Sequence, residues 1–245
     1  MRGAERRIRV SIACGVASLL SACAGVPRDP SLPIDDPNEQ FNRRVLAVNQ
    51  AVLDPVANVV KAATPPAVLD RLRDLDDNIQ EPRIFANDIL QGRIGPAGVT
   101  FGRFVFNSTF GLGGLFDIAT AGGLPKQSGD FGQTLFVWGV TPGPFVERPY
   151  FGPSTWRDSF GEYVDLAGDP VGWTLGLAFG WPAVAGESGL DAVVHLGQWK
   201  EAENASIDFY SFLRSDWYQA RRAQLREALG LPAVVESPAT AGSSR

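Results

Sequence analysis

The chain has 245 residues, of which 22 are basic and 27 acidic, and its formal net charge is −5. An acidic chain is a poor candidate for binding nucleic acid, and bulk charge gives it no attraction to anionic lipid headgroups. Any affinity for lipid must therefore come from apolar surface. The 27 Gly and 18 Pro residues predict many elements separated by frequent turns.

The first residues have the organisation of a secretory signal peptide. Four arginines lie within residues 2–9, an apolar run covers residues 10–20, and Ser21 and Ala22 precede Cys23. The apolar run is about 11 residues long, which is too short for a bilayer that needs about 20. We expect residues 1–22 to be removed, which would leave 18 basic and 26 acidic residues.

Cys23 directly follows Leu20, Ser21 and Ala22, and this pattern resembles the lipobox of bacterial lipoproteins. The resemblance implies that Cys23 receives a thioether diacylglycerol and an acyl chain, and that Ala24 favours sorting to the outer membrane. Several acyl chains anchor a protein stably, whereas one does so only marginally. The alternative is an ordinary secretory signal followed by a chance cysteine. We expect residues 23–35 to form a flexible, lipidated tether, because they contain three prolines and no periodicity.

Repeated cap-plus-proline signals predict a mostly α body over residues 36–230. Asp36 is the expected N-cap of the first helix, with Pro37 at its first position and Glu39 at its third. Further helix starts are predicted at Asp54-Pro55, Thr64-Pro65 and Glu81-Pro82. Gly92 is expected to end the last of these helices.

The segment over residues 97–119 is apolar nearly all round and is expected to be buried in protein or in lipid. Arg103, Asn107 and Asp117 interrupt it, and three glycines at 111, 113 and 114 break its helix, so a true transmembrane helix is disfavoured. A short hairpin is predicted between residues 135–140 and 145–150. Helices are expected again from Arg157, around 171–179 and within the amphipathic region 190–229. Residues 231–245 are expected to form a disordered tail.

Signatures of common chemistry are absent from the sequence. The single histidine, His195, lies among apolar residues, where a packed or surface role is favoured over metal ligation. The sequence has no HExxH, CxxC, GxSxG or GxGxxG pattern, so no catalytic residue, metal site or cofactor is predicted. Carboxylate pairs such as Asp76-Asp77 fall on charged helix ends, and spacing alone leaves a glycosidase pair open.

Several ordered segments together resemble the MlaA/VacJ family of lipoproteins, over residues 35–221. The matching segments are residues 36–43, 53–55, 78–82, Asn87, 90–92, Arg103-Phe104, Asn107, 111–117, 131–135, 138–140, 143–145, 152–158, Asp208, Tyr210, Arg214 and Gln219.

The resemblance implies a ring of short amphipathic helices around a central channel, lying in the inner leaflet of the outer membrane. It also implies that the protein removes mislocalised phospholipid from the outer leaflet and passes it to a soluble periplasmic carrier resembling MlaC. Association with a trimeric porin is implied as well, and no cofactor or chemistry is involved. The alternatives are a structural envelope lipoprotein or assembly partner, and a lipid-modifying enzyme.

Two sets of residues are expected to serve this function besides Cys23. A channel wall is predicted at Phe110, Gly111, Leu112, Gly113, Gly114, Leu115 and Phe116, because irregular backbone at membrane depth survives only where it is buried or lines a wet cavity. These glycines equally suit tight packing alone. Docking of the carrier is predicted at Asp208, Tyr210 and Arg214, on the last charged helix.

Overall fold

The structure is a computed structural model that describes residue 30, residues 35–168 and residues 202–232. Helices dominate this part of the chain, and the predicted mostly α class is confirmed. The elements are α2 (Glu39–Ala63), α3 (Pro66–Leu90), α4 (Ile94–Thr109), α5 (Ile118–Ala121), α6 (Phe131–Val137), β1 (Phe145–Arg148), β2 (Gly152–Thr155), α7 (Trp156–Gly168) and α10 (Phe209–Ala228). The predicted helices at 171–179, the start of the region 190–229, His195 and the tail after 232 lie outside the described residues.

The two longest helices continue through prolines that were expected to start new ones. Pro55 lies inside α2 and Pro82 lies inside α3, so the predicted starts at these two positions are wrong. A proline inside a helix removes one backbone N–H and strains the preceding turn, but packing can outweigh that cost. In α3 this packing comes from α4, which lies along it. The predicted start near Thr64-Pro65 is confirmed, as is the end at Gly92, whose φ of 77° breaks the helix.

The first helix begins later than its capping pattern predicted. The carbonyl of Asn38 accepts hydrogen bonds from the amides of Phe41 and Asn42, and α2 begins at Glu39. Asp36 is therefore not the N-cap, because its carboxylate binds side chains of α2 and α10 instead.

The small sheet uses a different partner from the one predicted. β1 pairs antiparallel with β2, with Phe145 opposite Thr155 and Arg148 opposite Gly152. Residues 131–137 are helical because the Asp130 carboxylate accepts from the amide of Gln133 and caps α6. The turn that joins the strands holds Tyr150 at a φ of 67°, a conformation that apolar alternation does not reveal.

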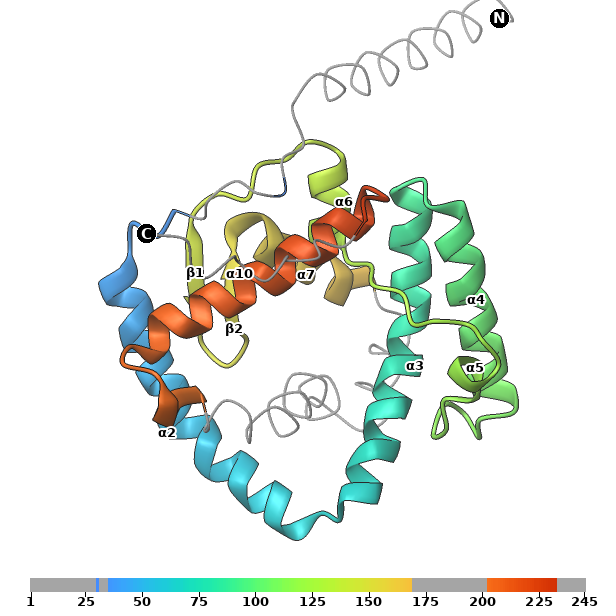
Figure 1. Cartoon of the computed structure of the whole chain (residues 1–245), viewed down its shortest axis with the longest axis horizontal. Helices are drawn as coiled ribbons and strands as arrows, with labels where there is room; N and C mark the ends of the chain where they lie inside the picture. The colour runs from blue at the N-terminus through green and yellow to red at the C-terminus, as the bar shows by residue number, and fades with distance from the viewer. Residues whose placement is uncertain (1–29, 31–34, 169–201, 233–245) are drawn as a thin grey trace, which may run out of the picture.

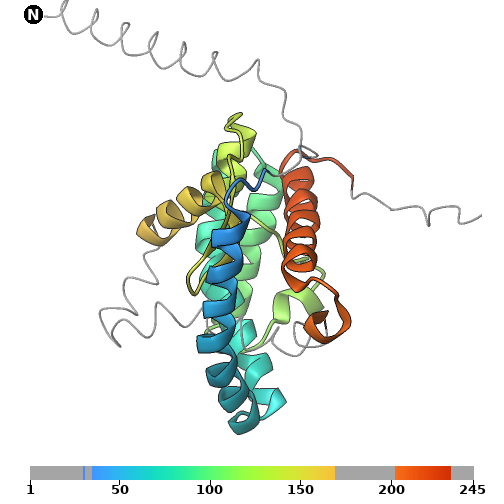
Figure 2. The ribbon, with the colours of Figure 1, turned by 90° about the vertical axis from the view of Figure 1, so that its left-hand side faces the viewer.

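The helices form an open frame that matches the predicted ring-like arrangement (Figure 1). α2 and α3 diverge from their short connection as two arms, α10 crosses between them, and α4 packs along the outer side of α3. Seen from the side, α10 and α7 lie on opposite faces of this frame (Figure 2). The two broad faces are thus formed by helices of different composition.

A cluster of buried apolar side chains joins α2, β1 and α10. Leu46 of α2, Phe145 of β1, and Tyr210 and Leu213 of α10 form a buried cluster. Phe145 packs edge-on against Tyr210, with ring centroids 6.2 Å apart, and against Trp217 at 5.9 Å. This core attaches α10 to the arm formed by α2.

Candidate functional site

α4 carries polar residues on its inner side and apolar residues on its outer side. Thr100, Arg103 and Asn107 are buried, whereas Phe101 is 56% exposed and Phe106 is 48% exposed. The segment that looked apolar all round is therefore two-sided, and its large apolar side chains face outward. This arrangement is the reverse of a helix that packs an apolar stripe on a water-soluble core.

Arg103 is the centre of the polar interior between α3 and α4. Its Nε donates to the carboxylate of Glu81 at 2.6 Å, and the side chains of this pair are each only 1% exposed. Its two terminal nitrogens reach Thr120, the carbonyl of Leu124 and Asp117. One guanidinium thus joins α3, α4 and the start of α5.

The irregular segment after α4 is held from its polar side. Asp117 caps α5 through the amide of Thr120 and also accepts from Asn107 at 3.1 Å. Burial would raise the pKa of Asp117, but the hydrogen bonds that it accepts lower it to about 2. On the other side of the same segment, Phe110 is 69% exposed and Leu112 is 68% exposed.

The three glycines of this segment differ in their surroundings. A Cβ on Gly111 would lie 2.3 Å from the carbonyl oxygen of Phe116, and one on Gly114 would lie 2.5 Å from the Cβ of Asn78. A Cβ on Gly113 would meet no atom within 4 Å, although its φ is 74°. Close packing therefore explains Gly111 and Gly114, whereas at Gly113 only the backbone conformation favours glycine.

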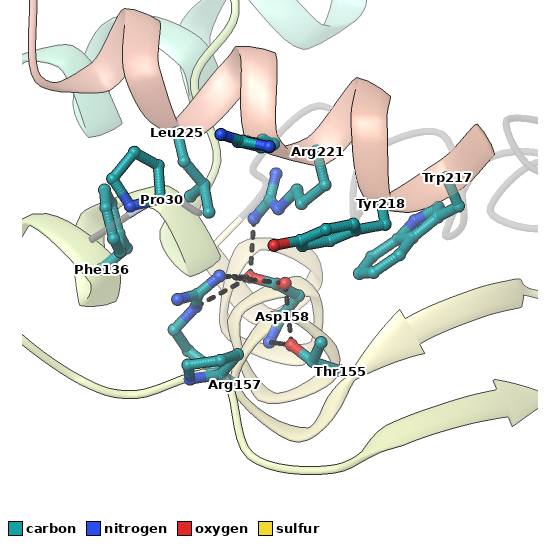
Figure 3. A pocket seen from close by; sticks show the side chains of 11 residues that line it. Pro30, Phe136, Thr155, Arg157, Asp158, Trp217, Tyr218, Arg221 and Leu225 are labelled. Carbon is teal, nitrogen blue, oxygen red and sulfur yellow. Dashed lines mark hydrogen bonds and ion pairs between the residues drawn. The ribbon is translucent and has the colours of Figure 1, made fainter. Parts of the chain in front are cut away.

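A second buried ionic cluster joins α10 to α6 and α7. Figure 3 shows Arg157 and Asp158, at the start of α7, meeting below the Arg221 side chain of α10. Arg221 donates to Asp130 at 2.6 and 2.8 Å and to Asp158 at 2.7 Å. Because Asp130 also caps α6, a single arginine aligns three helices.

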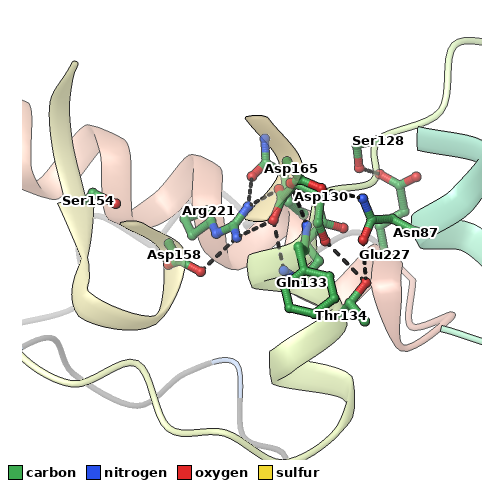
Figure 4. Close-up of polar contacts among 12 residues, drawn as sticks. Asn87, Ser128, Asp130, Gln133, Thr134, Ser154, Asp158, Asp165, Arg221 and Glu227 are labelled. Atoms are coloured by element: carbon green, nitrogen blue, oxygen red, sulfur yellow. Dashed lines mark hydrogen bonds and ion pairs between the residues drawn. The ribbon is translucent and has the colours of Figure 1, made fainter. Parts of the chain in front are cut away.

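The same cluster extends to α3 (Figure 4). Asn87 donates to Asp165 at 2.8 Å and accepts from Thr134, and Asp165 also accepts from the amide of Phe131. Burial raises the pKa of Asp165 to about 6 despite these hydrogen bonds. Neither ionic cluster was predicted from the sequence. The one signal was Arg103, a charge inside an apolar stretch, but its partner was not identifiable.

The outward surface is rich in apolar side chains on several elements. On α7, Trp156, Phe160 and Tyr163 form an exposed aromatic stripe, while Arg157, Asp158 and Asp165 face inward. Exposed large apolar residues on α2 and after α4 are Phe41, Val48, Val52, Val59, Phe110, Leu112, Phe116 and Ile118. Among the described helices, none is both long enough and apolar enough to cross a membrane. Within the same residues, no group of three or more His, Cys, Asp or Glu could hold a metal ion.

The predicted docking residues lie together at the junction of α2 and α10. Asp208 caps α10 and accepts from Arg43 at 2.7 and 2.6 Å. The hydroxyl of Tyr210 donates to Asp36 at 2.6 Å, and Arg214 donates to the same carboxylate oxygen at 2.7 Å. All three side chains therefore make contacts within the chain that fix α10. The lipidation residue Cys23 lies outside the described residues.

Comparisons with known proteins agree with this arrangement. The model of the MlaA lipoprotein family matches residues 34–224. The chain belongs to this family. An intermembrane phospholipid transport system lipoprotein MlaA of Escherichia coli (strain K12) is 30% identical over 224 residues, which cover 87% of each chain. The corresponding lipoprotein of Haemophilus influenzae is 34% identical over 141 residues, which cover 54% of this chain and 56% of that one.

A solved structure described as "Structural basis for maintenance of bacterial outer membrane lipid asymmetry" is similar in fold. The TM-score is 0.66 at 27% identity, over 78% of this chain and 99% of that chain. An uncharacterized protein of Rickettsia felis is 32% identical over 200 residues, which cover 80% of each chain. Membership of the MlaA lipoprotein family therefore covers the frame, both ionic clusters and the segment after α4.

Proposed function

We propose that this member of the MlaA lipoprotein family removes mislocalised phospholipid from the outer leaflet of the outer membrane. It then passes the lipid to a periplasmic carrier, and so maintains lipid asymmetry. The observation that supports this most is the reversed distribution of polarity, with ionic clusters inside and large apolar side chains outside. A protein surrounded by water would bury those side chains, because each large one contributes about 1.5–3 kcal/mol when buried. Acyl chains are a suitable environment for them.

The frame lies within one leaflet in this proposal. Amphipathic helices that do not span a bilayer can lie in its interface with their apolar side buried. α7 directs Trp156, Phe160 and Tyr163 outward on one face, and Trp and Tyr are the residues enriched at membrane interfaces. The opposite face carries α10, whose exposed residues include Ser215, Asp216, Gln219 and Glu227. We therefore place α10 toward the periplasm.

The lipid path uses the segment over residues 110–116. Its apolar side chains at Phe110 and Leu112 are exposed, and its backbone is irregular yet held by Asn78, Asn107 and Asp117. Such a segment can present a rigid apolar wall to acyl chains without any change in the helices that support it. Gly113 is the position at which a larger side chain would enter open space.

The partners in this proposal are phospholipid, a porin trimer and a carrier resembling MlaC. The porin follows from the family resemblance alone. For the carrier, we propose the exposed polar side of α10 around Asp216 and Gln219, with Asp208, Tyr210 and Arg214 holding that helix in position. Cys23 supplies the lipid anchor, after removal of residues 1–22 as a signal peptide.

The test is deletion and complementation in a strain with no second copy of the gene. Deletion should raise outer-leaflet phospholipid, measured by surface labelling, and should sensitise cells to SDS with EDTA. The wild-type gene should reverse both effects, and Cys23→Ser should reverse neither. An intact barrier with unchanged outer-leaflet phospholipid after deletion would refute lipid removal and leave a structural envelope role. Mass spectrometry of lipid retained by the detergent-purified protein provides the biochemical counterpart.

A further inference from the structure

Arg71 of α3 is a cation in direct contact with the apolar segment over residues 110–116. Its Nη1 donates to the carbonyl of Leu115 at 3.1 Å, and its guanidinium lies over the ring of Phe116, 4.7 Å from the centroid. The same nitrogen pairs with Asp74 at 2.8 Å, and the Arg71 side chain is 40% exposed. Arg71 is therefore held in one orientation at the edge of this segment.

The contacts of Arg71 leave one edge of its guanidinium facing away from them. Within the described residues, both of its polar contacts use Nη1. A guanidinium has five N–H donors in a planar fork, and the fork matches the oxygens of a phosphate group. Another carboxylate of this region, Asp117, already accepts from Arg103 and Thr120. The Nε and Nη2 donors of Arg71 are thus available to an anion.

Arg71 also lies on the border between a charged and an apolar side of α3. Successive residues of a helix are about 100° apart around its axis, which places Asp70 and Asp74 on one side of Arg71. Val68 and Leu72 lie on its other side, and both are exposed. The headgroup and the acyl chains of a phospholipid need such neighbouring surfaces.

The two carboxylates beside Arg71 favour a cation. Asp70 and Asp74 are four residues apart, so their side chains are neighbours on the helix and repel each other. Asp70 is 56% exposed, and the distance between its Oδ1 and Nη1 of Arg73 is 3.6 Å. A cation bound between the two carboxylates would relieve their repulsion. An ammonium group is such a cation.

We propose that Arg71, Asp70 and Asp74 form a binding site for a zwitterionic phospholipid headgroup such as phosphoethanolamine. The phosphate binds the free edge of Arg71, the ammonium lies between the two aspartates, and the acyl chains contact residues 110–116. This inference rests on the proposed function, because it names the headgroup of the lipid that the protein removes.

The site distinguishes headgroups by local pairing. The formal net charge of the chain is −5, so bulk charge does not attract an anionic lipid. A phosphoglycerol headgroup could bind Arg71, but it carries no cation for Asp70 and Asp74. Because partly exposed ion pairs contribute little free energy, the expected preference for the zwitterion is only about threefold.

Competition between two lipids tests this site. The lipidated, detergent-purified protein is equilibrated with mixed micelles of equimolar phosphatidylethanolamine and phosphatidylglycerol that have identical acyl chains, and the retained lipid is measured by mass spectrometry. The wild type should retain about threefold more phosphatidylethanolamine, and Asp70→Asn should bring the ratio to about one without loss of phosphatidylglycerol. Arg71→Gln should lower both lipids, because both contain the phosphate. Arg73→Gln, on the other side of Asp70, is the matched control and should lower neither.

The outcomes separate the headgroup site from the proposed function. A wild-type protein that retains no phospholipid would refute lipid removal itself. Retention of both lipids at the supplied ratio would overturn the zwitterionic site and leave lipid removal intact. The same conclusion would follow from equal loss of both lipids in Asp70→Asn or from unchanged retention in Arg71→Gln. If circular dichroism shows that Arg71→Gln does not fold, Arg71→Lys replaces it. Lysine keeps the charge without the planar fork, so both lipids should still fall, by a smaller factor.

Discussion

The α3–α4 unit and the α2–β1–α10 unit differ in the side chains that fill the space between their elements. Between α3 and α4 the interior contains Arg103, Glu81 and Asn107, and the large apolar side chains of α4 face outward. Between α2, β1 and α10 the interior contains Phe145 and Leu213, and α10 exposes mostly polar side chains. The two units therefore differ in what lies at their centres, an ion pair in one and an aromatic cluster in the other, although α2 also exposes Phe41 and Val59.

The difference fits the surroundings that the proposed function gives to each unit. A buried ion pair gives little net stability over an apolar core, but removing one partner leaves an uncompensated charge. Under the proposed function, lipid outside stabilises the apolar residues of the α3–α4 unit, so this unit keeps such a pair in its interior. The α2–β1–α10 unit has a conventional apolar core at Leu46, Phe145 and Leu213. The family's link with outer-membrane lipid fits a frame with one side in each environment.

The largest expected effect is at the ionic interior of the α3–α4 unit. Arg103→Met should cost about 3–5 kcal/mol in the free energy of unfolding, because Glu81 would stay buried without its partner. Thermal and denaturant unfolding in detergent would measure this cost. The double variant Arg103→Met with Glu81→Met should recover a large part of it. A loss below about 1 kcal/mol for the single variant would contradict the contrast between the two units.

A smaller effect should separate two glycines in the segment after α4. Gly114→Ala should cost roughly 2–4 kcal/mol, because its φ is 101° and the new Cβ would meet Asn78 at 2.5 Å. Gly113→Ala should lower the free energy of unfolding by only about 1–2 kcal/mol, because the new Cβ meets no atom and only the backbone conformation is strained. Melting temperatures of the matched pair are the measurement. Equal losses would mean that the contact with Asn78 does not limit this segment.

The glycine pair also decides how the lipid path is tested. Gly113→Leu should remain folded, lipidated and associated with porin, yet fail to restore the SDS and EDTA barrier if acyl chains pass this wall. Gly114→Leu should lose stability and complementation together, as packing predicts. A fully functional Gly113→Leu protein would remove this segment from the proposed path.

The next effect depends on pH and lies in the α2–β1–α10 unit. Burial raises the pKa of Glu147 from 4.5 to about 7, while the hydrogen bond from Asn49 works in the other direction. Since the folded protein keeps a proton that the unfolded chain loses, this residue reduces stability as pH rises from about 4.5 to 7. Glu147→Gln stays neutral and should be more stable than the wild type by about 1–3 kcal/mol at pH 8, with the gain vanishing near pH 4.5.

Thermal unfolding of both proteins between pH 4.5 and 8 would measure this gain. Asp165, whose pKa burial raises to about 6, is present in both proteins, so its contribution cancels in the difference. A gain that is the same at every pH would show that Glu147 does not hold a proton in the folded state.

The sequence predicted the helical class, the start of α3 and the end at Gly92, because caps, prolines and glycines act within a few residues. It did not predict that α2 and α3 pass through Pro55 and Pro82, since the compensation in α3 comes from packing on another helix. The hairpin partner was missed for a related reason: capping by Asp130 made residues 131–137 helical.

Local sequence patterns also could not predict which residues pair in the buried ionic clusters. Arg103 stood out as a charge in an apolar stretch, but Glu81 is 22 positions away and only the pairing of α3 with α4 brings it close. Arg221 meets Asp130 across 91 positions, on a helix whose end looked merely solvated. Asp208, Tyr210 and Arg214 were selected through the family resemblance, and the structure gives them contacts that the resemblance did not specify.

The smallest effect on stability gives the sharpest test of the comparison itself. Phe101 of α4 is 56% exposed and Phe212 of α10 is 44% exposed, so Phe101→Cys and Phe212→Cys should each change the free energy of unfolding by only about 0.5 kcal/mol. In lipidated protein reconstituted into phosphatidylethanolamine and phosphatidylglycerol bilayers, a spin label on each cysteine reports its surroundings. The label at position 101 should relax faster with oxygen, which dissolves in the hydrocarbon region, and the label at 212 should relax faster with a water-soluble nickel chelate. The reverse result would show that the proposed orientation of the frame in the membrane is wrong. If both labels relaxed faster with the chelate, the α3–α4 unit would lie in water, and its exposed apolar surface would have no explanation.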